Sequence, residues 1–311
     1  MRKKILITDS LFIFSEHEKM LAHAGYETER LDTPTASEDQ LIKHLKGKVG
    51  YILGGIEKVT DKVIDAAGEL KAIVFTGADW RFFIPGHKLA TTRGIAIANA
   101  PGANSYAVAE YTITLMLAMI RNIFISGRTG DVKFLTTPSL NDQTIGIVGM
   151  GSVGLKVAQS LRSLGAKEIL YYSRTRKPEI EQKTGVKFVS LEKLLSKSDI
   201  ITLHVSREAG MGFVGKNELA KMKAGALIIN CGFTGGIDKD ALFNELQSGR
   251  LRAAQDDPMD ERFNALPLSH WFNSNSHGAY NTFEANKIAS DMATKSLLSL
   301  LATGKDQYRV N

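Results

Sequence analysis

The sequence predicts an α/β fold in which parallel sheets form two domains. The chain has 311 residues, which is too long for one small domain and suits two. Hydrophobic residues make up 43% and charged residues 23%, so each domain has enough apolar material for a core. Short apolar runs alternate with helical patterns, which is typical of parallel sheets with helices on both faces.

The first hundred residues carry one strand–helix series. A helix is expected at 15–24, and strands are expected at 4–8, 50–53, 72–75 and 96–98. A long helix at 106–125 follows. Its apolar residues lie on all sides, so we expect it to be buried on more than one side, between domains or between subunits.

A second series begins at Thr144. Its expected strands are residues 144–148, 169–172, 200–203, 226–230, 251–254 and 271–273, and its expected helices are 153–164, 239–248 and 282–301. Asp238 is expected to cap the helix 239–248, and Gly249 is expected to end it.

Composition and charge exclude several classes of protein. The net charge is +6, but Lys and Arg are spread along the chain, so we expect no nucleic-acid partner, whereas anionic small ligands are compatible with this charge. The single cysteine, Cys231, excludes an internal disulfide framework and a Cys-rich zinc site, and it fits a cytoplasmic location. No metal site is expected. The first apolar run ends at Asp9, too early for a signal peptide, and the run from Tyr111 to Ile120 is about half of a membrane span.

A glycine motif follows the expected strand 144–148 and opens the next helix. Gly149, Gly151 and Gly154 form a G-x-G-x-x-G pattern, with Ser152 and Val153 between them. Gly149 allows a tight turn, Gly151 lets the backbone approach a pyrophosphate, and Gly154 lets helix and strand pack closely. The positive end of the helix dipole then faces the phosphates. This spacing predicts a dinucleotide site, and the alternative is a glycine-rich turn in an ordinary strand–helix unit.

The end of the following strand predicts which dinucleotide binds. An NAD site needs an acid there, whereas this chain has Ser173, Arg174 and Arg176 and no acid before Glu179. The two arginines are suited to a 2′-phosphate, so we expect NADP(H) to be preferred over NAD(H). The alternative is that they are solvated loop charges.

Beyond these motifs, the chain resembles the D-isomer-specific 2-hydroxyacid dehydrogenases along nearly its whole length. The blocks that carry the resemblance are residues 70–79, 97–110, 144–154, 199–205, 222–230 and 308–311. The stretch Ser173 to Pro178 is most similar to the NADP-using glyoxylate/hydroxypyruvate reductase branch.

The resemblance implies two Rossmann-like domains, one flavodoxin-like and one dinucleotide-binding, with a cleft between them. Residues 1–100 plus 285–311 would form the substrate domain. Residues 101–284 would form the cofactor domain, and its long helix would support a homodimer. The resemblance also places cofactor contacts at His204, Val205 and Cys231.

The family uses a histidine, an acid that orients it, and an arginine that holds the substrate carboxylate. His277 matches the histidine block, because its distance to Glu284 and Ala285 fits, and the reaction needs a proton donor of the kind that histidine supplies. His270 is the competing candidate. The arginine is missing: Asn230 and Asp238 keep the register of the family motif, and Phe233 stands at the arginine position. Losing such a charge typically lowers the rate by about 10²–10³.

The acid is also displaced. Counting from Asp238 without gaps puts Asp257 on the family's cofactor-side aspartate and Arg262 on its glutamate. Glu261 becomes the orienting acid only if the loop shifts by one residue, and surface charge is the alternative for each acid here.

Further substrate contacts are expected at two glycine turns in the first domain. Gly54 and Gly55 would offer N–H groups to an anionic substrate, or they simply form a turn after a strand. Gly77 and Arg81 belong to a second turn, where Trp80 and Arg81 depart from the family pattern. Three arginines are candidates to restore the missing positive charge: Arg81, Arg207 and Arg262.

Together these features predict an NADP(H)-dependent oxidoreductase that passes hydride between nicotinamide and a carbonyl or 2-hydroxy acid substrate. Because of Phe233, that substrate could be a larger or less acidic carbonyl compound. The alternative is an NADP(H)-binding dimer with reduced catalysis that acts as a sensor or interaction protein. The retained histidine block favours the enzyme, whereas the missing arginine and the displaced acid favour the alternative.

Overall fold

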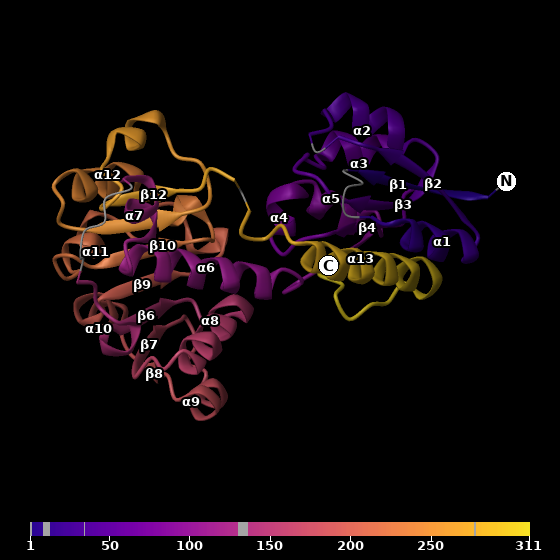
Figure 1. The fold of residues 1–311 in the computed structure, drawn as a ribbon. Helices are drawn as coiled ribbons and strands as arrows, with labels where there is room; N and C mark the ends of the chain where they lie inside the picture. Colours follow the sequence, from indigo (N-terminus) through magenta and orange to yellow (C-terminus); the bar gives the residue numbers. More distant parts are fainter. Residues whose placement is uncertain (1, 9–12, 34, 130–135, 277) are drawn as a thin grey trace. The chain divides into compact units, whose positions relative to one another are not determined.

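The computed structural model describes residues 2–8, 13–33, 35–129, 136–276 and 278–311. The chain forms two compact units (Figure 1): one combines Met1–Asn104 with Thr282–Asn311, and the other is Ser105–Asn281. Each unit contains one parallel sheet, which confirms the predicted α/β fold class. In the described part of the chain, no helix combines the length and apolar character needed to cross a membrane.

The unit formed by both ends of the sequence has a five-stranded sheet in the order β2-β1-β3-β4-β5. Its strands are β1 (Lys3–Thr8), β2 (Tyr26–Leu31), β3 (Lys48–Leu53), β4 (Ala72–Phe75) and β5 (Ala96–Asn99). All of the neighbouring strands are parallel. This is the flavodoxin-like order, whose reversal between β1 and β3 places a crevice at the carboxyl ends of these strands.

Helices cover both faces of this sheet. They are α1 (Ser15–His23), α2 (Glu38–Leu45), α3 (Asp61–Ala66), α4 (Trp80–Phe83), α5 (His87–Thr92) and α13 (Phe283–Thr303). Because side chains alternate along a strand, Ile5 and Ile7 pack with α1 and α13, whereas Leu6 packs with α2 and α3. Figure 1 shows α13, in yellow, lying against the sheet that the first hundred residues form.

The second unit has a seven-stranded sheet in the order β12-β11-β10-β9-β6-β7-β8. Its strands are β6 (Thr144–Val148), β7 (Glu168–Tyr172), β8 (Lys187–Phe188), β9 (Ile200–Leu203), β10 (Leu227–Asn230), β11 (Arg252–Gln255) and β12 (Trp271–Asn273). All pairs are parallel. The order reverses between β6 and β9, as in the doubly wound nucleotide-binding fold, so a ligand crevice is expected where these two strands end.

The helices of this unit also form two layers. They are α6 (Ser105–Ile120), α7 (Ile123–Thr129), α8 (Ser152–Ser163), α9 (Pro178–Thr184), α10 (Leu191–Lys197), α11 (Lys216–Ala220) and α12 (Lys239–Gln247), with 3-10 turns η2 (Leu140–Asp142), η3 (Arg207–Ala209), η4 (Thr234–Gly236) and η5 (Glu261–Ala265). Apolar residues of α6 and α8 pack on one face of the sheet, and those of α10, α11 and α12 pack on the other. The Asp238 carboxylate accepts a hydrogen bond from the Ala241 N–H at 2.9 Å, which confirms the predicted cap of α12.

The long helix expected at 106–125 is wrong in its extent. The helix α6 ends at Ile120, and α7 begins at Ile123. The break lies at Asn122, whose φ of 53° is left-handed, a conformation that asparagine tolerates better than most residues. Within its own unit α6 buries 11 of its 16 residues, which accounts for its apolar character on most sides.

Candidate functional site

The turn between β6 and α8 is shaped by three glycines, each with a different constraint. Gly149 has a φ of +100°, and a Cβ there would lie 2.3 Å from the His204 carbonyl oxygen. A Cβ on Gly154 would lie 2.1 Å from the Gly149 oxygen, so helix and turn touch through backbone atoms. Above Gly151, by contrast, nothing lies within 4 Å of the Cβ position. The turn is therefore closed on the protein side and open where a ligand would approach.

The open side of this turn has the chemistry of an anion site. Gly151 caps α8 without a side-chain hydrogen bond, and Ser152 and Val153 open the first helical turn. The first N–H groups of a helix have no partner within the helix, and they carry the positive end of its dipole. Because β6 and β9 meet at the reversal of strand order, this geometry fits the pyrophosphate of a dinucleotide.

After the end of β7, the two predicted arginines differ in their ion pairing. Arg176 forms a bidentate ion pair with Glu181, at 2.9 Å from Nε and 2.7 Å from Nη2. Arg176 and then Tyr171 lower the Glu181 pKa to about 2. Ser173 donates a hydrogen bond to the Thr175 carbonyl at 2.6 Å. Arg174 is exposed and forms no ion pair with the described residues. Of the two arginines, Arg174 is therefore the one whose charge no acid among the described residues neutralises.

Three predicted cofactor residues follow β9 and β10. His204 accepts or donates a 3.0 Å hydrogen bond through Nε2 to Thr202, its Nδ1 is buried without a described partner, and burial lowers its pKa to about 4. It is therefore neutral at physiological pH. Val205 follows it and is partly buried. Cys231 is buried, and burial, followed by the nearby Asp256, raises its thiol pKa, so it is protonated and not a nucleophile.

The loop after β10 holds Phe233 at its end. Phe233 is partly exposed and precedes the turn η4. The hydroxyl of Thr234, the next residue, donates a hydrogen bond to Asp257. The predicted aspartate and the residue at the family's arginine position therefore belong to one loop cluster at the carboxyl ends of β10 and β11.

The candidate histidine His277 lies outside the described residues, but the chain on both sides of it is described. The carboxylate of Asp256 accepts the Ala279 N–H at 3.1 Å, and the Asp256 carbonyl accepts the Ser276 N–H at 3.2 Å. Asp256 is buried, and burial, followed by repulsion from Asp257, raises its pKa. This buried acid thus anchors the segment that carries His277 at two points.

The competing histidine, His270, lies at the other edge of the sheet. It immediately precedes β12, and its carbonyl accepts the Ala253 N–H at 2.8 Å where β11 begins. Since all strands of this sheet are parallel, His270 lies at their amino ends, away from the Gly149 turn. This position removes the geometric basis for a catalytic role of His270.

The predicted orienting acid and its neighbour lie on the turn η5. Glu261 is exposed and makes no hydrogen bond or ion pair with any described residue. Arg262 forms ion pairs with Asp240 and Asp260, and it lies over the Phe243 ring at 4.8 Å. The positive charge of Arg262 is therefore neutralised locally.

The predicted substrate residues of the first unit lie at the carboxyl ends of β3 and β4. Gly55 is buried, and the Gly54 N–H donates to the Thr8 hydroxyl at 3.4 Å. A Cβ on Gly77 would lie 2.7 Å from the Phe75 ring. Arg81 is exposed on α4 and lies 4.5 Å from the Trp80 ring.

One buried network at this edge was not predicted. Glu57 is 4% exposed, and it accepts hydrogen bonds from the Thr8 hydroxyl and from the Tyr51 hydroxyl, the latter at 2.8 Å. Burial, followed by the Glu57 charge, raises the pKa of Tyr51. The network sits where the strand order reverses between β1 and β3. Asp256 was also not identified as a site residue from the sequence, although the count from Asp238 without gaps selected its neighbour Asp257.

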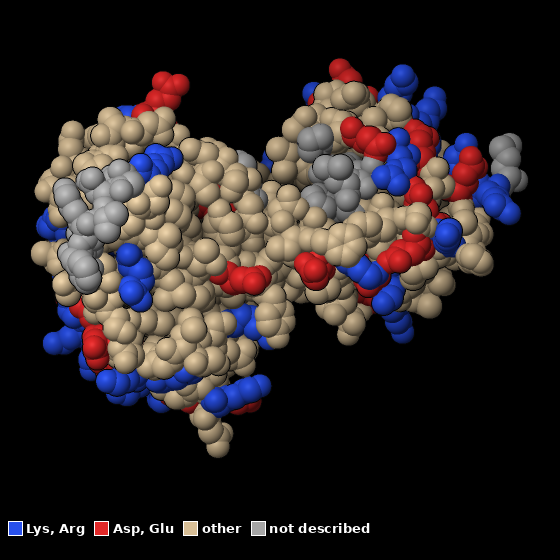
Figure 2. Space-filling view, in the orientation of Figure 1, with Lys and Arg blue, Asp and Glu red and all other residues tan. Residues whose placement is uncertain are grey.

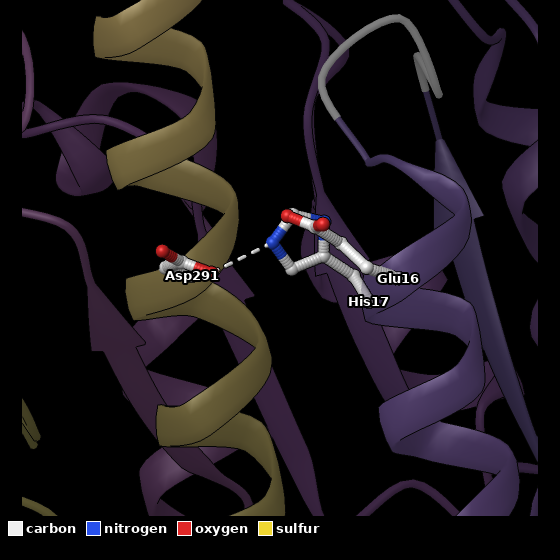
Figure 3. A group of neighbouring side chains, drawn as sticks. All are labelled: Glu16, His17 and Asp291. Carbon is white, nitrogen blue, oxygen red and sulfur yellow. Dashed lines mark hydrogen bonds and ion pairs between the residues drawn. The ribbon is translucent and has the colours of Figure 1, made fainter.

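One group of described side chains has the spacing of a metal site. Glu16, His17 and Asp291 lie together, with His17 extending from α1 toward α13 (Figure 3). The Phe14 N–H donates to His17 Nδ1 at 3.1 Å, so Nε2 carries the proton and donates to Asp291 at 2.9 Å. Glu16 is paired with Lys287. Both ring nitrogens therefore have hydrogen-bond partners, and the His17–Asp291 pair joins α1 to α13.

Charge on the surface is mixed. On the face that Figure 2 draws, acidic and basic side chains occur on both units. The expected absence of a nucleic-acid partner stays a prediction.

Comparison with known proteins identifies the family. The model for the NAD binding domain of D-isomer specific 2-hydroxyacid dehydrogenases matches residues 113–276. A glyoxylate reductase from Thermofilum pendens is 32% identical over 283 residues, covering 85% of this chain and 82% of the relative. A D-3-phosphoglycerate dehydrogenase from Archaeoglobus fulgidus is 34% identical over 225 residues, covering 70% of this chain and 42% of the relative, so this chain spans less than half the length of that relative. The crystal structure of a protein from Thermus thermophilus matches 99% of this chain and 100% of that one, with 26% identity and a TM-score of 0.86. This chain belongs to the D-isomer specific 2-hydroxyacid dehydrogenase family.

Proposed function

We propose that this protein is an NAD(P)-dependent dehydrogenase that interconverts a 2-hydroxy acid and its 2-oxo acid, and that it prefers NADP(H). The observation that carries the proposal is the glycine turn after β6, which is closed on the protein side and open above Gly151. The glyoxylate reductase named above supports a small 2-oxo acid as the first substrate class to test.

Each part of the chain has a role in this reaction. The N–H groups at the start of α8 bind the pyrophosphate, and the nicotinamide supplies or accepts hydride when it is bound. Cys231 and the neutral His204 line the carboxyl ends of β10 and β9 without adding charge. His277 donates the proton to the substrate oxygen as hydride reaches the carbon, and Asp256 holds the segment on either side of it.

The preference for NADP(H) is assigned to Arg174. Its guanidinium is paired with no acid in the described part of the chain, whereas Arg176 is held by Glu181. A charge-assisted contact to a 2′-phosphate contributes about 1.5–3 kcal/mol, so Arg174→Ala should weaken NADPH binding by about tenfold or more and leave NADH binding unchanged. Arg176→Ala is the matched control and should change NADPH affinity less. Fluorescence titration measures both, and equal affinity of the wild type for NADH and NADPH would contradict the preference.

The reaction is tested by cofactor oxidation with glyoxylate and hydroxypyruvate. We expect turnover with NADPH, and we expect His277→Ala to abolish it without changing the NADPH Kd. Phe233 favours a second candidate, an NADP(H)-binding protein with reduced catalysis. Tight NADPH binding without turnover of any 2-oxo acid, by the wild type, would support that candidate instead. The expected homodimer and cytoplasmic location belong to the same proposal, and light scattering of the purified protein tests the dimer.

A further inference from the structure

Two loops at the carboxyl edge of the second sheet bring a cation onto an aromatic ring. Arg207 begins the turn η3 after β9, and Phe233 precedes the turn η4 after β10. The guanidinium carbon of Arg207 lies 4.7 Å from the centre of the Phe233 ring. This distance is within the range of a cation–π interaction, and arginine is the residue that stacks most readily in this way.

The ring is held in place by the loops around it. The Gly212 N–H donates to the Gly235 carbonyl at 2.7 Å, and the Val214 N–H donates to the Gly236 carbonyl at 2.9 Å, so the two loops are hydrogen-bonded to each other. A Cβ on Gly235 would lie 2.5 Å from Phe233 Cζ, so the ring packs directly on this glycine. Phe233 is therefore a fixed support between Gly235 and Arg207.

The position of the pair within the sheet tells which end of a bound dinucleotide it faces. With the pyrophosphate at α8 and the adenosine ribose at the end of β7, the other half of the dinucleotide runs over β9 and β10, because the two halves lie on opposite sides of the reversal in strand order. The Gly149 turn touches the backbone of His204, three residues before Arg207. The Arg207–Phe233 pair thus lies on the nicotinamide side.

The other two arginine candidates are placed differently. Arg262 is neutralised by Asp240 and Asp260. Arg81 belongs to the other unit, where it stacks on Trp80. Arg207 is therefore the candidate that combines a location on the nicotinamide side with a rigid aromatic support.

We propose that Arg207, supported on the ring of Phe233, binds the carboxylate of the substrate, so that the positive charge of the site comes from the loop after β9. The Phe233 ring lies on one side of the Arg207 guanidinium, whose N–H groups form a planar fork that matches a carboxylate. Phe233 then holds the cation in place. The inference rests on the proposed function, because it requires a carboxylate substrate next to the nicotinamide.

The test compares three variants with NADPH and glyoxylate. Arg207→Met should lower kcat/KM by about 10²–10³-fold, as expected for the loss of one charged stabiliser, and should leave the NADPH Kd unchanged. Phe233→Leu, which keeps Arg207 but removes its support, should raise KM more than it lowers kcat. The double variant Arg207→Met with Phe233→Arg should recover at least tenfold of the lost activity, because it returns a guanidinium to the same loop cluster.

The matched control is Arg262→Met. Arg262 also stacks on a phenylalanine of this unit, Phe243, at 4.8 Å, but on the turn η5. This variant should keep wild-type kinetics. Unchanged kcat/KM in Arg207→Met would overturn the inference while the proposed function stands.

A binding measurement separates the remaining outcomes. Oxamate, a 2-oxo acid mimic that is not reduced, is titrated into the NADPH complex by calorimetry. We expect the wild type to bind oxamate and Arg207→Met to lose it. If the wild type binds NADPH but neither reduces glyoxylate nor binds oxamate, the proposed function and the inference both fail. Oxamate binding that is equal in the wild type and Arg207→Met would overturn the inference alone.

Discussion

The glycine turn after β6 makes opposite predictions for two neighbouring Gly→Ala changes. At Gly154 the new Cβ would lie 2.1 Å from the Gly149 oxygen, which is backbone and cannot rotate away. At Gly151 the backbone has a φ of −86°, which alanine adopts without strain, and nothing lies within 4 Å of the new Cβ. Gly154→Ala should therefore disturb the fold, and Gly151→Ala should disturb the ligand.

The size of each effect follows from these distances. An ordinary contact between carbon and oxygen is about 3.3 Å or longer, so Gly154→Ala requires the start of α8 to move by about 1 Å. Overpacking of this kind costs about 1–3 kcal/mol, offset by up to ~1 kcal/mol from replacing a helical glycine. A net loss of about 1–2 kcal/mol lowers the Tm of a unit of this size by about 2–8 °C. Gly151→Ala should cost no more than about 1 kcal/mol, because alanine is a poorer N-cap than glycine, but it should raise the NADPH Kd at least tenfold, because the methyl group occupies the space that the pyrophosphate needs.

Thermal unfolding with and without NADPH, together with fluorescence titration, distinguishes the two outcomes. The control is Gly127→Ala in α7, where a Cβ also meets nothing within 4 Å. It should leave the NADPH Kd close to that of the wild type and raise the stability by up to ~1 kcal/mol, because alanine replaces a helical glycine. The reasoning is refuted if Gly151→Ala binds NADPH as tightly as the wild type, because the open space would then not be the ligand's. It is equally refuted if Gly154→Ala unfolds at the wild-type temperature.

Three further predictions concern buried groups of the same unit. Burial lowers the pKa of His204 from 6.5 to about 4, so between pH 6.5 and pH 4 the imidazole takes up a proton only in the unfolded chain. The free energy of unfolding should therefore fall as the pH drops through this range. His204→Gln should reduce the difference between the urea midpoints at pH 7 and pH 5. Cys231 should not react with a thiol reagent at pH 8 until urea unfolds the unit, and rapid labelling of the folded protein would show that burial does not hold its thiol protonated. Asp256→Ala should lower the free energy of unfolding in urea by about 1–3 kcal/mol, because the buried Ala279 N–H loses its acceptor. Asp256→Asn keeps an acceptor and removes a charge that Asp257 repels, so it should cost less. If the asparagine variant loses as much stability as the alanine variant, the hydrogen bond is not the cause.

The strands of both units show what periodicity predicts and what it misses. The core strands β4, β6 and β9 were predicted with their observed bounds, because each is a short buried apolar run. The edge strand β2 was missed, since four of the six residues in its sequence YETERL are polar or charged and none is fully buried. The break after α6 had a signal in Asn122, but the apolar run on both sides of it favoured one continuous helix.

The candidate site likewise has features that the sequence predicts and features that only the structure shows. The glycine motif was predicted because backbone geometry, not side-chain contacts, defines it. Which charges remain unpaired was not predictable, since the pairing of Arg176 with Glu181 depends on where α9 turns back beside β7. The role of Asp256 was missed for a similar reason: a count along the chain selects Asp257, and only the fold shows which of the two carboxylates reaches the Ala279 N–H.

The helix α13 gives the protein an unusual order of assembly on the ribosome. Its apolar side chains complete a layer whose other members, such as Ile5, Ile7 and Val74, are synthesised long before it. At ordinary rates of translation, this layer waits roughly ten to forty seconds for its last helix. The unit Ser105–Asn281 is continuous in sequence and can finish folding during that interval. Until α13 is made, α1 alone covers this face of the early sheet, so part of its apolar surface stays exposed while the continuous unit can already be folded.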